Sequence, residues 1–394
     1  MGRGRDGRRH VLVPELYIGL ISGTSRDGVE AALASSGGPL GWQVLGHLRY
    51  PYPESVAADL ARLTVAGHGH FQELGQLDAA IGEVFADAAM ALLRMADLKP
   101  EAIRAIGSHG QTLHHAPNAP RPFSWQIGDP FRIAERTGID TVAMFRQRDI
   151  AAGGEGAPIA CGLHAECFAD SSITRAVVNI GGISNITWLR PGKPVLGYDC
   201  GPGNTLMDAW IRRIKGLPFD ANGEWAAEGK VSAQLLRTLR ADPFFELAAP
   251  KTTGPEYFSL RWLEDRLAAV TDRVADIDVQ ASLTELTAGI VADAVLAERA
   301  EGPPRDVLVC GGGVRNGELM RRLRNRLGDI PVAETGDLGL PAEQVEAAAF
   351  AWLARQTIHA QAGNLPEVTG AAGPRILGCI VPGARPATGA IERT

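Results

Sequence analysis

The sequence IGLISGTSRDGVEAALAS, residues 18–35, contains two apolar runs joined by a turn of small, hydroxyl and charged residues. The apolar residues at 18–21 predict a buried strand, and the alternating apolar residues at 29–33 predict a returning one. The turn at 22–28 contains two glycines, three hydroxyl residues, an arginine and an aspartate. Asp-Gly is a common hairpin turn, but glycine N–H groups and hydroxyls also bind phosphate, and a carboxylate holds Mg²⁺ through water. The turn alone supports either an ordinary hairpin or an anion-binding loop.

Two further glycine turns follow along the chain. The sequence AVVNIGGISNITWL, residues 176–189, repeats the pattern of strand, glycine turn and strand in the second half of the chain. Three consecutive glycines at 311–313 stand between a predicted strand and a predicted amphipathic helix that begins near Asn316. A junction of strand, glycine and helix is typical of nucleotide-binding sites. The repeated hairpin turn favours a duplicated two-lobe architecture over a solenoid.

The composition is that of an ordinary globular protein, with 394 residues, 45% hydrophobic and 21% charged. A formal net charge of −6 and the lack of a long basic stripe argue against nucleic-acid binding. The start of the chain, MGRGRDGRRHVLVPELYIGLIS, makes a poor signal peptide, and no apolar run approaches the roughly 18 residues of a membrane helix. We therefore expect a cytoplasmic protein with a frayed basic tail and no membrane association. Five cysteines without a CxxC pair argue against structural zinc and a disulfide framework.

The order of the three turns, two of the phosphate-binding hairpin type and then the triple glycine, resembles the actin/hexokinase/Hsp70 superfamily of ATPases. The resemblance implies an α/β fold of two similar lobes, each a mixed sheet with helices (the duplicated actin-like ATPase fold), which clamp ATP in an interlobe cleft. We place the first lobe at residues 1–144 with 365–394 and the second lobe at residues 145–364. Residues 363–371 are expected to form a linker, and the sequence RILGCIVPG after it is expected to return to the first lobe.

A closer resemblance, to the anhydro-N-acetylmuramic acid kinases, extends from residue 19 to residue 383. It is carried by nine motifs: GTSRDGVEAAL, SHGQTLHH, SWQIGDPFRIAERTGI, FRQRDIAAGGEGAPI, NIGGISNIT, GYDCGPGNTLMDAW, CGGGVRN, EAAAFAWLA and GNLPEVTGA. The family resemblance implies a homodimer that opens the 1,6-anhydro ring of anhydro-N-acetylmuramic acid with ATP, Mg²⁺ and water. It implies phosphorylation of O6, which gives N-acetylmuramic acid 6-phosphate in peptidoglycan recycling.

The implied reaction needs a base for water and a clamp for phosphate, because the cyclic sugar has no free 6-hydroxyl. By resemblance, Asp199 is the base and Glu346 orients the sugar or the water. From the residues alone, Asp199 at the end of a predicted strand is also consistent with a turn or cap aspartate. Glu346, at the start of a predicted helix, is equally consistent with a solvated carboxylate.

The expected ATP-binding residues lie in four glycine-containing segments: Gly23, Thr24, Ser25, Arg26, Asp27, Gly28, Val29, Glu30, Asn179, Gly181, Gly182, Asn185, Gly201, Gly203, Asn204, Gly311, Gly312 and Gly313. Asp27 is also the expected Mg²⁺ ligand. The expected sugar-binding residues are Ser108, His109, Gly110, Gln111, Thr112, Arg146 and Arg148. A guanidinium suits the lactyl carboxylate because it donates two parallel hydrogen bonds. On residue type alone, His109 fits a structural histidine and the arginines fit surface residues.

The chain departs from the family motifs at Arg26, Glu30, Glu155, Ser184 and Pro255, where methionine, aspartate, glutamine, alanine and arginine are usual. These departures leave open a related anhydro sugar such as levoglucosan as the substrate. A plain sugar kinase, which phosphorylates a free hydroxyl, and a non-catalytic, nucleotide-gated sugar sensor also remain open. A repressor-type sensor would need a helix-turn-helix segment, for which the basic N-terminal tail is too short.

Overall fold

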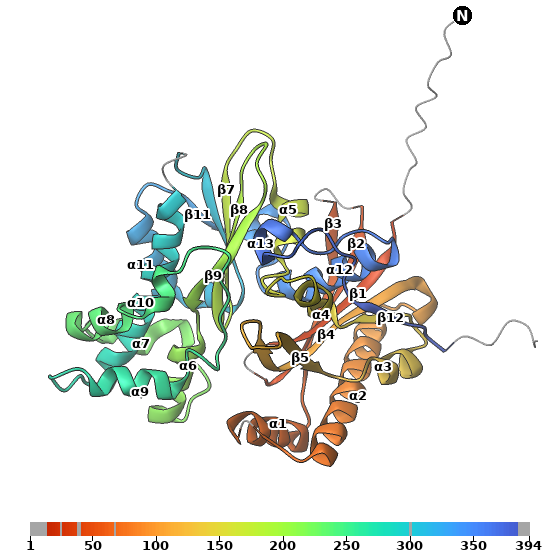
Figure 1. Cartoon of the computed structure of the whole chain (residues 1–394), viewed down its shortest axis with the longest axis horizontal. Helices are drawn as coiled ribbons and strands as arrows, with labels where there is room; N and C mark the ends of the chain where they lie inside the picture. The colour runs from red at the N-terminus through yellow and green to blue at the C-terminus, as the bar shows by residue number, and fades with distance from the viewer. Residues whose placement is uncertain (1–13, 24–25, 38–40, 67, 299–301, 385–394) are drawn as a thin grey trace, which may run out of the picture.

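The structure is a computed structural model that describes residues 14–384 except 24–25, 38–40, 67 and 299–301. The predicted basic tail lies outside the described residues. Two sheets with flanking helices lie on either side of the view in Figure 1. The sheet on the right contains the first hairpin, and the sheet on the left contains the second.

The first sheet has the strand order β12-β6-β4-β1-β2-β3, and β5 pairs with β4. The predicted hairpin is present, since β1 and β2 pair antiparallel and β3 continues the meander. β4 runs parallel to β1, and β6 runs parallel to β4. The strands are β1 (Leu16–Ser22), β2 (Gly28–Ser36), β3 (Trp42–Pro51), β4 (Ile103–Ala116), β5 (Phe123–Ile127), β6 (Thr141–Ala143) and β12 (Cys379–Val381).

The second sheet has the order β11-β10-β7-β8-β9. β7, β8 and β9 form an antiparallel meander, and β10 and β11 extend it in parallel from β7. This arrangement repeats that of β1–β4 and β6, so the predicted duplicated α/β fold is confirmed. The strands are β7 (Arg175–Ile180), β8 (Ile183–Leu189), β9 (Leu196–Pro202), β10 (Asp306–Cys310) and β11 (Val332–Glu334).

Helices cover both sheets (Figure 1). The α-helices are α1 (Glu54–Ala66), α2 (Phe71–Met95), α3 (Pro130–Thr137), α4 (Phe145–Ala151), α5 (Cys161–Phe168), α6 (Thr205–Lys215), α7 (Glu224–Glu228), α8 (Ala233–Arg240), α9 (Leu260–Ala268), α10 (Asp276–Ala297), α11 (Gly317–Leu327), α12 (Val345–Ile358) and α13 (Pro366–Thr369). Short 3₁₀ turns are η1 (Pro100–Ala102), η2 (Ala221–Gly223), η3 (Pro243–Glu246), η5 (Gly312–Arg315) and η6 (Thr335–Leu338). The predicted amphipathic helix is α11, which begins after Asn316, whose side chain accepts a hydrogen bond from the Leu319 N–H at 3.0 Å.

Helix α12 packs against the first sheet, although it follows the second sheet in sequence. The contact is close because glycines lie beneath it. A Cβ atom at Gly19 would lie 1.8 Å from the Ala347 carbonyl oxygen, and one at Gly107 would lie 2.0 Å from that of Phe350. α12 belongs to the segment predicted for the second lobe, and β12, from the segment predicted to return, pairs with β6. The lobe boundaries themselves stay a prediction.

Helix α10 is long and apolar enough to span a membrane by length and composition, with a mean hydropathy of 1.3 over its best 18-residue window. However, 83% of that window is buried inside the protein. α10 packs against α6, α7, α8 and α11 and against the second sheet. This is the environment of a core helix.

Candidate active site

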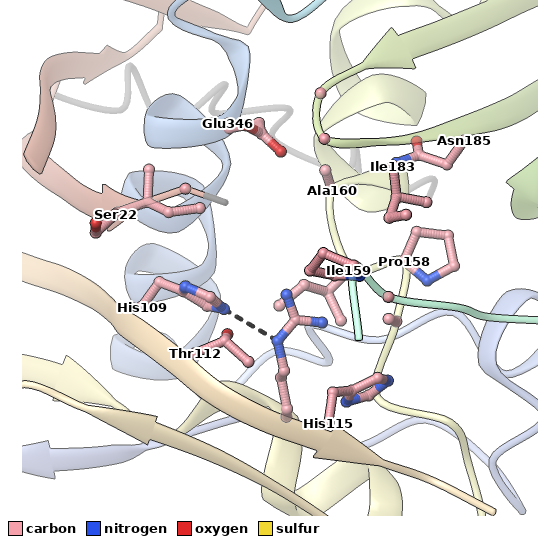
Figure 2. Close-up of a pocket in the computed structure, with 18 of the residues that line it drawn as sticks. Ser22, His109, Thr112, His115, Pro158, Ile159, Ala160, Ile183, Asn185 and Glu346 are labelled. Carbon is pink, nitrogen blue, oxygen red and sulfur yellow. Dashed lines mark hydrogen bonds between the residues drawn. The ribbon is translucent and has the colours of Figure 1, made fainter. Parts of the chain in front are cut away.

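A cavity of about 210 Å³ lies between the two halves of the chain (Figure 2). The predicted site residues that line it are Gly23, Arg26, His109, Gln111, Thr112, Arg146, Asn179, Gly181, Gly182, Asn185, Asp199 and Glu346. The structure does not bring the other described candidates to the cavity wall, namely Asp27, Gly28, Val29, Glu30, Ser108, Gly110, Arg148, Gly201, Gly203, Asn204, Gly311, Gly312 and Gly313. Thr24 and Ser25 lie outside the described residues.

Asp199 lies on β9, next to its strand partner Asn185 on β8. Its Oδ2 accepts a hydrogen bond of 2.9 Å from the backbone N–H of Thr253. Burial raises the pKa of Asp199 to about 7, although the Thr253 N–H and the charge of Arg146 lower it. A general base works best when its pKa is near the operating pH. The carboxyl group therefore has a proton affinity suited to accepting a proton from water.

Glu346 lies in the first turn of α12 and points into the cavity from the side opposite the β7–β8 turn (Figure 2). Its Oε1 accepts a hydrogen bond of 3.1 Å from Asn179 Nδ2 at the end of β7. Burial raises the pKa of Glu346, while the Asn179 hydrogen bond and the charge of Arg146 lower it. The carboxyl group thus faces the cavity and not the surrounding solvent, and it links α12 to the second sheet.

Arg146, on α4, supplies a half-buried cation to the same cavity. Its Nε donates a hydrogen bond of 3.0 Å to His109 Nε2, and its Nη1 donates one of 2.7 Å to the Gly156 carbonyl oxygen. Burial lowers the pKa of Arg146 to about 10, against the opposing effect of Asp199 and Glu346. The guanidinium is still charged at neutral pH and lies within electrostatic range of both carboxyl groups.

Helix α4 directs its next polar residues away from the cavity. Arg148 is exposed, because residues two apart on a helix do not share a face. Asp149 is fully buried and accepts hydrogen bonds from Gly156 N–H at 2.8 Å, Asn364 Nδ2 at 2.7 Å and Thr369 Oγ1 at 2.7 Å. The segment expected to be a linker is therefore packed, contains α13 and is attached to α4.

The first hairpin turn is held by the side chain of Gln111 on β4, and it lies close to the backbone of β3. Ser22 Oγ donates a hydrogen bond of 2.6 Å to Gln111 Oε1 on β4, and Gln111 Nε2 donates one of 3.5 Å to the Gly23 carbonyl oxygen. On the other side, a Cβ atom at Gly28 would lie 2.4 Å from the carbonyl oxygen of Tyr50 on β3. Gln111 thus supports the turn, and Gly28 allows β3 to approach it.

The acidic residues of this hairpin contact basic residues of β3. Asp27 forms an ion pair with Arg49, and Glu30 Oε2 lies 2.8 Å from His47 Nε2. Glu30 Oε1 also lies 3.5 Å from Arg49 Nε. Among the described residues, no group of three or more His, Cys, Asp or Glu side chains is arranged to hold a metal ion. A metal at Asp27 would therefore need further ligands from water or from a bound phosphate.

The second hairpin turn is held by the segment that follows β9. Asn204 Nδ2 donates hydrogen bonds to the carbonyl oxygens of Gly181 at 2.9 Å and Ile180 at 3.2 Å. The Gly203 N–H donates one of 2.8 Å to the Gly182 carbonyl oxygen. Gly203 and Asn204 therefore shape the turn whose glycines line the cavity.

The triple glycine lies at the end of β10, as predicted. Gly311 has φ +82°, and a Cβ atom there would lie 2.3 Å from Asn179 Oδ1. A Cβ atom at Gly313 would lie 2.4 Å from Ile180 Cγ2, whereas one at Gly312 would meet nothing within 4 Å. Gly311 and Gly313 allow close packing on β7, and Gly312 leaves an open backbone surface.

His115 and two cavity-lining segments, 157–160 and 253–256, were not predicted from the sequence. His115 Nδ1 lies 2.9 Å from Ser124 Oγ, and its Nε2 is buried with no hydrogen-bond partner among the described residues. Burial, with the charge of Arg146, lowers its pKa to about 3, so the ring is neutral. The alternation of residues 109, 111, 113 and 115 along one strand was the available signal.

Arg26 and Glu256 line the cavity from opposite halves of the chain. The Arg26 Nε is buried and has no hydrogen-bond partner among the residues that the structure describes. Burial lowers the pKa of Arg26, and the negative charge of Glu256 opposes this shift. The two side chains attract each other across the cavity.

Comparisons with known proteins show the family of the chain. The family model described as anhydro-N-acetylmuramic acid kinase matches residues 15–383. The chain is 48% identical over 379 residues to the anhydro-N-acetylmuramic acid kinase of Xanthomonas campestris pv. campestris strain 8004, covering 93% of this chain and 97% of the relative. It is 45% identical over 366 residues to the anhydro-N-acetylmuramic acid kinase of Pseudomonas paraeruginosa strain PA7, covering 93% of this chain and 98% of the relative.

Solved structures also match along most of the chain. The ROK hexokinase of Thermus thermophilus matches with 15% identity and a TM-score of 0.36, over 87% of this chain and 99% of its own. The family is shown by the sequence match and not by these structures. The matched residues include both hairpin turns, the triple glycine, Asp199 and Glu346. The chain belongs to the anhydro-N-acetylmuramic acid kinase family.

Proposed function

We propose that this kinase uses ATP and water to convert anhydro-N-acetylmuramic acid to N-acetylmuramic acid 6-phosphate in cell-wall recycling. The observation that carries the proposal is the convergence of Asp199, Arg146 and Glu346 on one cavity, in a chain similar to named anhydro-N-acetylmuramic acid kinases along almost its whole length. The cavity lies between the two halves of the chain, so a sugar bound there would face Asp199, Arg146 and Glu346.

The proposed reaction couples ring opening to phosphoryl transfer. The water oxygen bonds to the anomeric carbon as the bond from that carbon to O6 breaks. O6 bonds to the γ-phosphorus as the bond from that phosphorus to the bridging oxygen breaks, and ADP leaves. Asp199 accepts a proton from the water, and its pKa of about 7 supports this role. The hydrogen bond from Asn179 to Glu346 supports Glu346 as the group that orients the sugar or the water.

The two hairpin turns and the triple glycine are the proposed ATP site. Gly23 and Arg26 of the first turn and Gly181 and Gly182 of the second border the cavity from opposite sides. Backbone N–H groups at glycine turns bind phosphate oxygens. The open surface over Gly312 suits the flat face of a base or ribose.

Mg²⁺ fits the phosphate side of this site. Mg²⁺ in kinases is held by one or two carboxylates together with water and phosphate oxygens. Asp27 is the proposed ligand, because it lies on the first hairpin turn, whose residues Gly23 and Arg26 line the cavity, and the ion would neutralise phosphate charge.

We also propose that the enzyme is a cytoplasmic homodimer. Phe71 and Met95 at the ends of α2 are 94% and 57% exposed, and Phe131 on α3 is 69% exposed. Phe71 and Met95 lie at opposite ends of the 25-residue α2 and so form no common patch, and the proposal of a homodimer rests on the family resemblance. Sedimentation velocity tests the proposal, since a monomer at all micromolar concentrations would contradict it.

The proposed function is tested by incubating the purified chain with ATP, Mg²⁺ and anhydro-N-acetylmuramic acid in ¹⁸O-labelled water. We expect ADP and a sugar phosphate that carries the label on the anomeric hydroxyl and none in the phosphate ester. Already open N-acetylmuramic acid and levoglucosan serve as comparison substrates. Equal rates with the open sugar would show an ordinary sugar kinase, and label in the ester would contradict attack of water at the anomeric carbon.

A further inference from the structure

His109 and Arg146 form a hydrogen-bonded pair that lines the cavity. His109 lies on β4 and is 7% exposed, and its ring packs against Phe350 of α12 with ring centroids 4.6 Å apart. Arg146 reaches the ring from α4, and Figure 2 shows the hydrogen bond between the two side chains as a dashed line. The pair therefore connects a strand of the first sheet, α4 and α12 at one point.

The two polar contacts of the ring determine which nitrogen carries the proton. Nδ1 lies 3.1 Å from the Gly110 carbonyl oxygen, which only accepts, so Nδ1 carries the hydrogen and donates it. Nε2 faces the Nε–H of Arg146, which only donates, so Nε2 is unprotonated and accepts. Burial and the charge of Arg146 lower the pKa of His109 well below its usual value. The ring is therefore a neutral acceptor at neutral pH.

The guanidinium of Arg146 is fixed at two points, by His109 at Nε and by Gly156 at Nη1. Among the described residues it has no other hydrogen-bond acceptor, and it lines the cavity. Its positive charge lowers the pKa of Asp199 and of Glu346. The orientation of this one side chain therefore affects the proton affinity of both carboxyl groups.

We propose that His109 is a positioning residue, whose neutral Nε2 orients the Arg146 guanidinium toward Asp199 and Glu346. The inference rests on the proposed function, because it assigns control of the proton affinity of the base, Asp199, to a residue that does not itself accept the proton. The titratable or charged groups that face Asp199, Arg146 or His109 are Asp149, Glu155, Cys161, Cys200, Lys251, Glu346 and His115. Of the described side chains, Arg146 is the one hydrogen-bonded to His109.

Two amide substitutions separate orientation from packing. The amide of His109→Gln reaches the position of Nε2, whereas the amide of His109→Asn reaches only that of Nδ1. In His109→Asn we expect kcat/KM for the sugar to fall by on the order of tenfold or more, as for a lost hydrogen bond to a charged group. The acid limb of kcat/KM should move to higher pH, because a displaced Arg146 no longer lowers the pKa of Asp199. In His109→Gln, both the value of kcat/KM and the position of its acid limb should stay close to wild type.

Thermal unfolding and the Kd for ATP serve as controls for structural damage. The unfolding temperature and the Kd should be similar in His109→Asn and His109→Gln. An unchanged acid limb in His109→Asn, or equal losses in both variants, would overturn the positioning role.

The tautomer has its own readout. ¹⁵N NMR of histidine-labelled wild type should show His109 neutral, with the proton on Nδ1, between about pH 5 and pH 8. A protonated Nε2 would overturn the proposal even if the substitutions fail to fold. Absence of wild-type activity on the anhydro sugar would instead contradict the proposed function, while the NMR result would still decide the hydrogen bond.

Discussion

Asp199 combines burial with a single backbone donor, and this combination suits a base. A carboxylate that accepts several N–H groups has a low pKa and holds its charge, whereas burial alone favours the neutral acid. Among the residues that the structure describes, Asp199 has one such donor, Thr253, together with the nearby charge of Arg146, and burial raises its pKa to about 7. The carboxylate is therefore available at neutral pH and is basic enough to take a proton.

Replacing Asp199 by asparagine should remove basicity and preserve shape. We expect the single-turnover rate to fall by roughly 10²–10⁴-fold, with little change in the affinities for ATP and sugar. The fold should be as stable as wild type, because a neutral amide avoids the cost of burying a charge. Glu346→Gln should lose less rate, since orienting a substrate is a smaller task than accepting its proton. If Asp199→Asn keeps more than about a tenth of the wild-type rate, the base lies elsewhere.

At the level of single residues, the sequence predicted several of the side chains that line the cavity, but it did not predict their hydrogen-bond and ion-pair partners. Asp199, Glu346 and Arg146 were expected in one cleft, and the structure brings them to one cavity. The ion pair of Asp27 with Arg49 was not predictable, because it depends on the pairing of β2 with β3. The position of His115 in the cavity wall was missed, since it depends on which face of β4 is turned toward the cavity.

Helix α12 places Glu346 in the cavity because its backbone lies directly on the first sheet. The sequence EAAAFAWLA gives this helix an alanine-rich face, and glycines at the contact remove the Cβ atoms that would hold it away. Gly107, beneath Phe350, leaves no space for even a methyl group. Small residues on both surfaces thus determine the position of a candidate catalytic side chain.

The substitution Gly107→Ala should therefore lower both stability and activity. Overpacking of this kind costs about 1–3 kcal/mol of unfolding free energy, measured by urea denaturation. The matched control is Gly312→Ala, where a Cβ atom meets nothing within 4 Å, and its stability should stay within about 0.5 kcal/mol of wild type. Gly312→Ala should raise the KM for ATP by obstructing the proposed nucleotide surface. Wild-type stability of Gly107→Ala would show that α12 is free to shift.

The individual strands, turns and helices were more predictable from the sequence than the packing of one element against another. The hairpin β1–β2, the repeat at β7–β8 and the helix α11 all follow from short-range periodicity and capping. The packing of α12 on the first sheet depends on contacts between residues far apart in sequence, which periodicity does not report. The segment 363–371 looked like a linker because it is rich in glycine and proline, yet Asn364 and Thr369 anchor it to Asp149.

On the scale of the whole molecule, the duplicated strand order places a hairpin turn from each sheet at one cavity. Arg26 comes from one half and Glu256 from the other, and both line the cavity wall. Phosphoryl transfer requires exclusion of every water except the reacting one, which an open cleft does not provide. The two lobes are therefore expected to close on their substrates.

Closure should be visible by small-angle X-ray scattering as a smaller radius of gyration when both substrates are bound. Asp199→Asn, which is expected to bind both substrates and to turn over much more slowly, allows the complex with ATP, Mg²⁺ and sugar to be measured before it reacts. The sugar alone and ATP alone serve as controls, and we expect the full decrease only with both. An unchanged radius in the ternary complex would contradict closure.

The ribosome completes β1 and β4 long before it makes α12, the helix that covers them. Tyr17, Ala105 and Val142 share an apolar cluster with the buried residues of this late helix. A nascent chain therefore carries an uncovered apolar sheet face while the whole second lobe is being translated. Ribosome-bound chains that stop before residue 345 should recruit chaperones and aggregate after release, and only the full-length product should complete the core of its own first lobe.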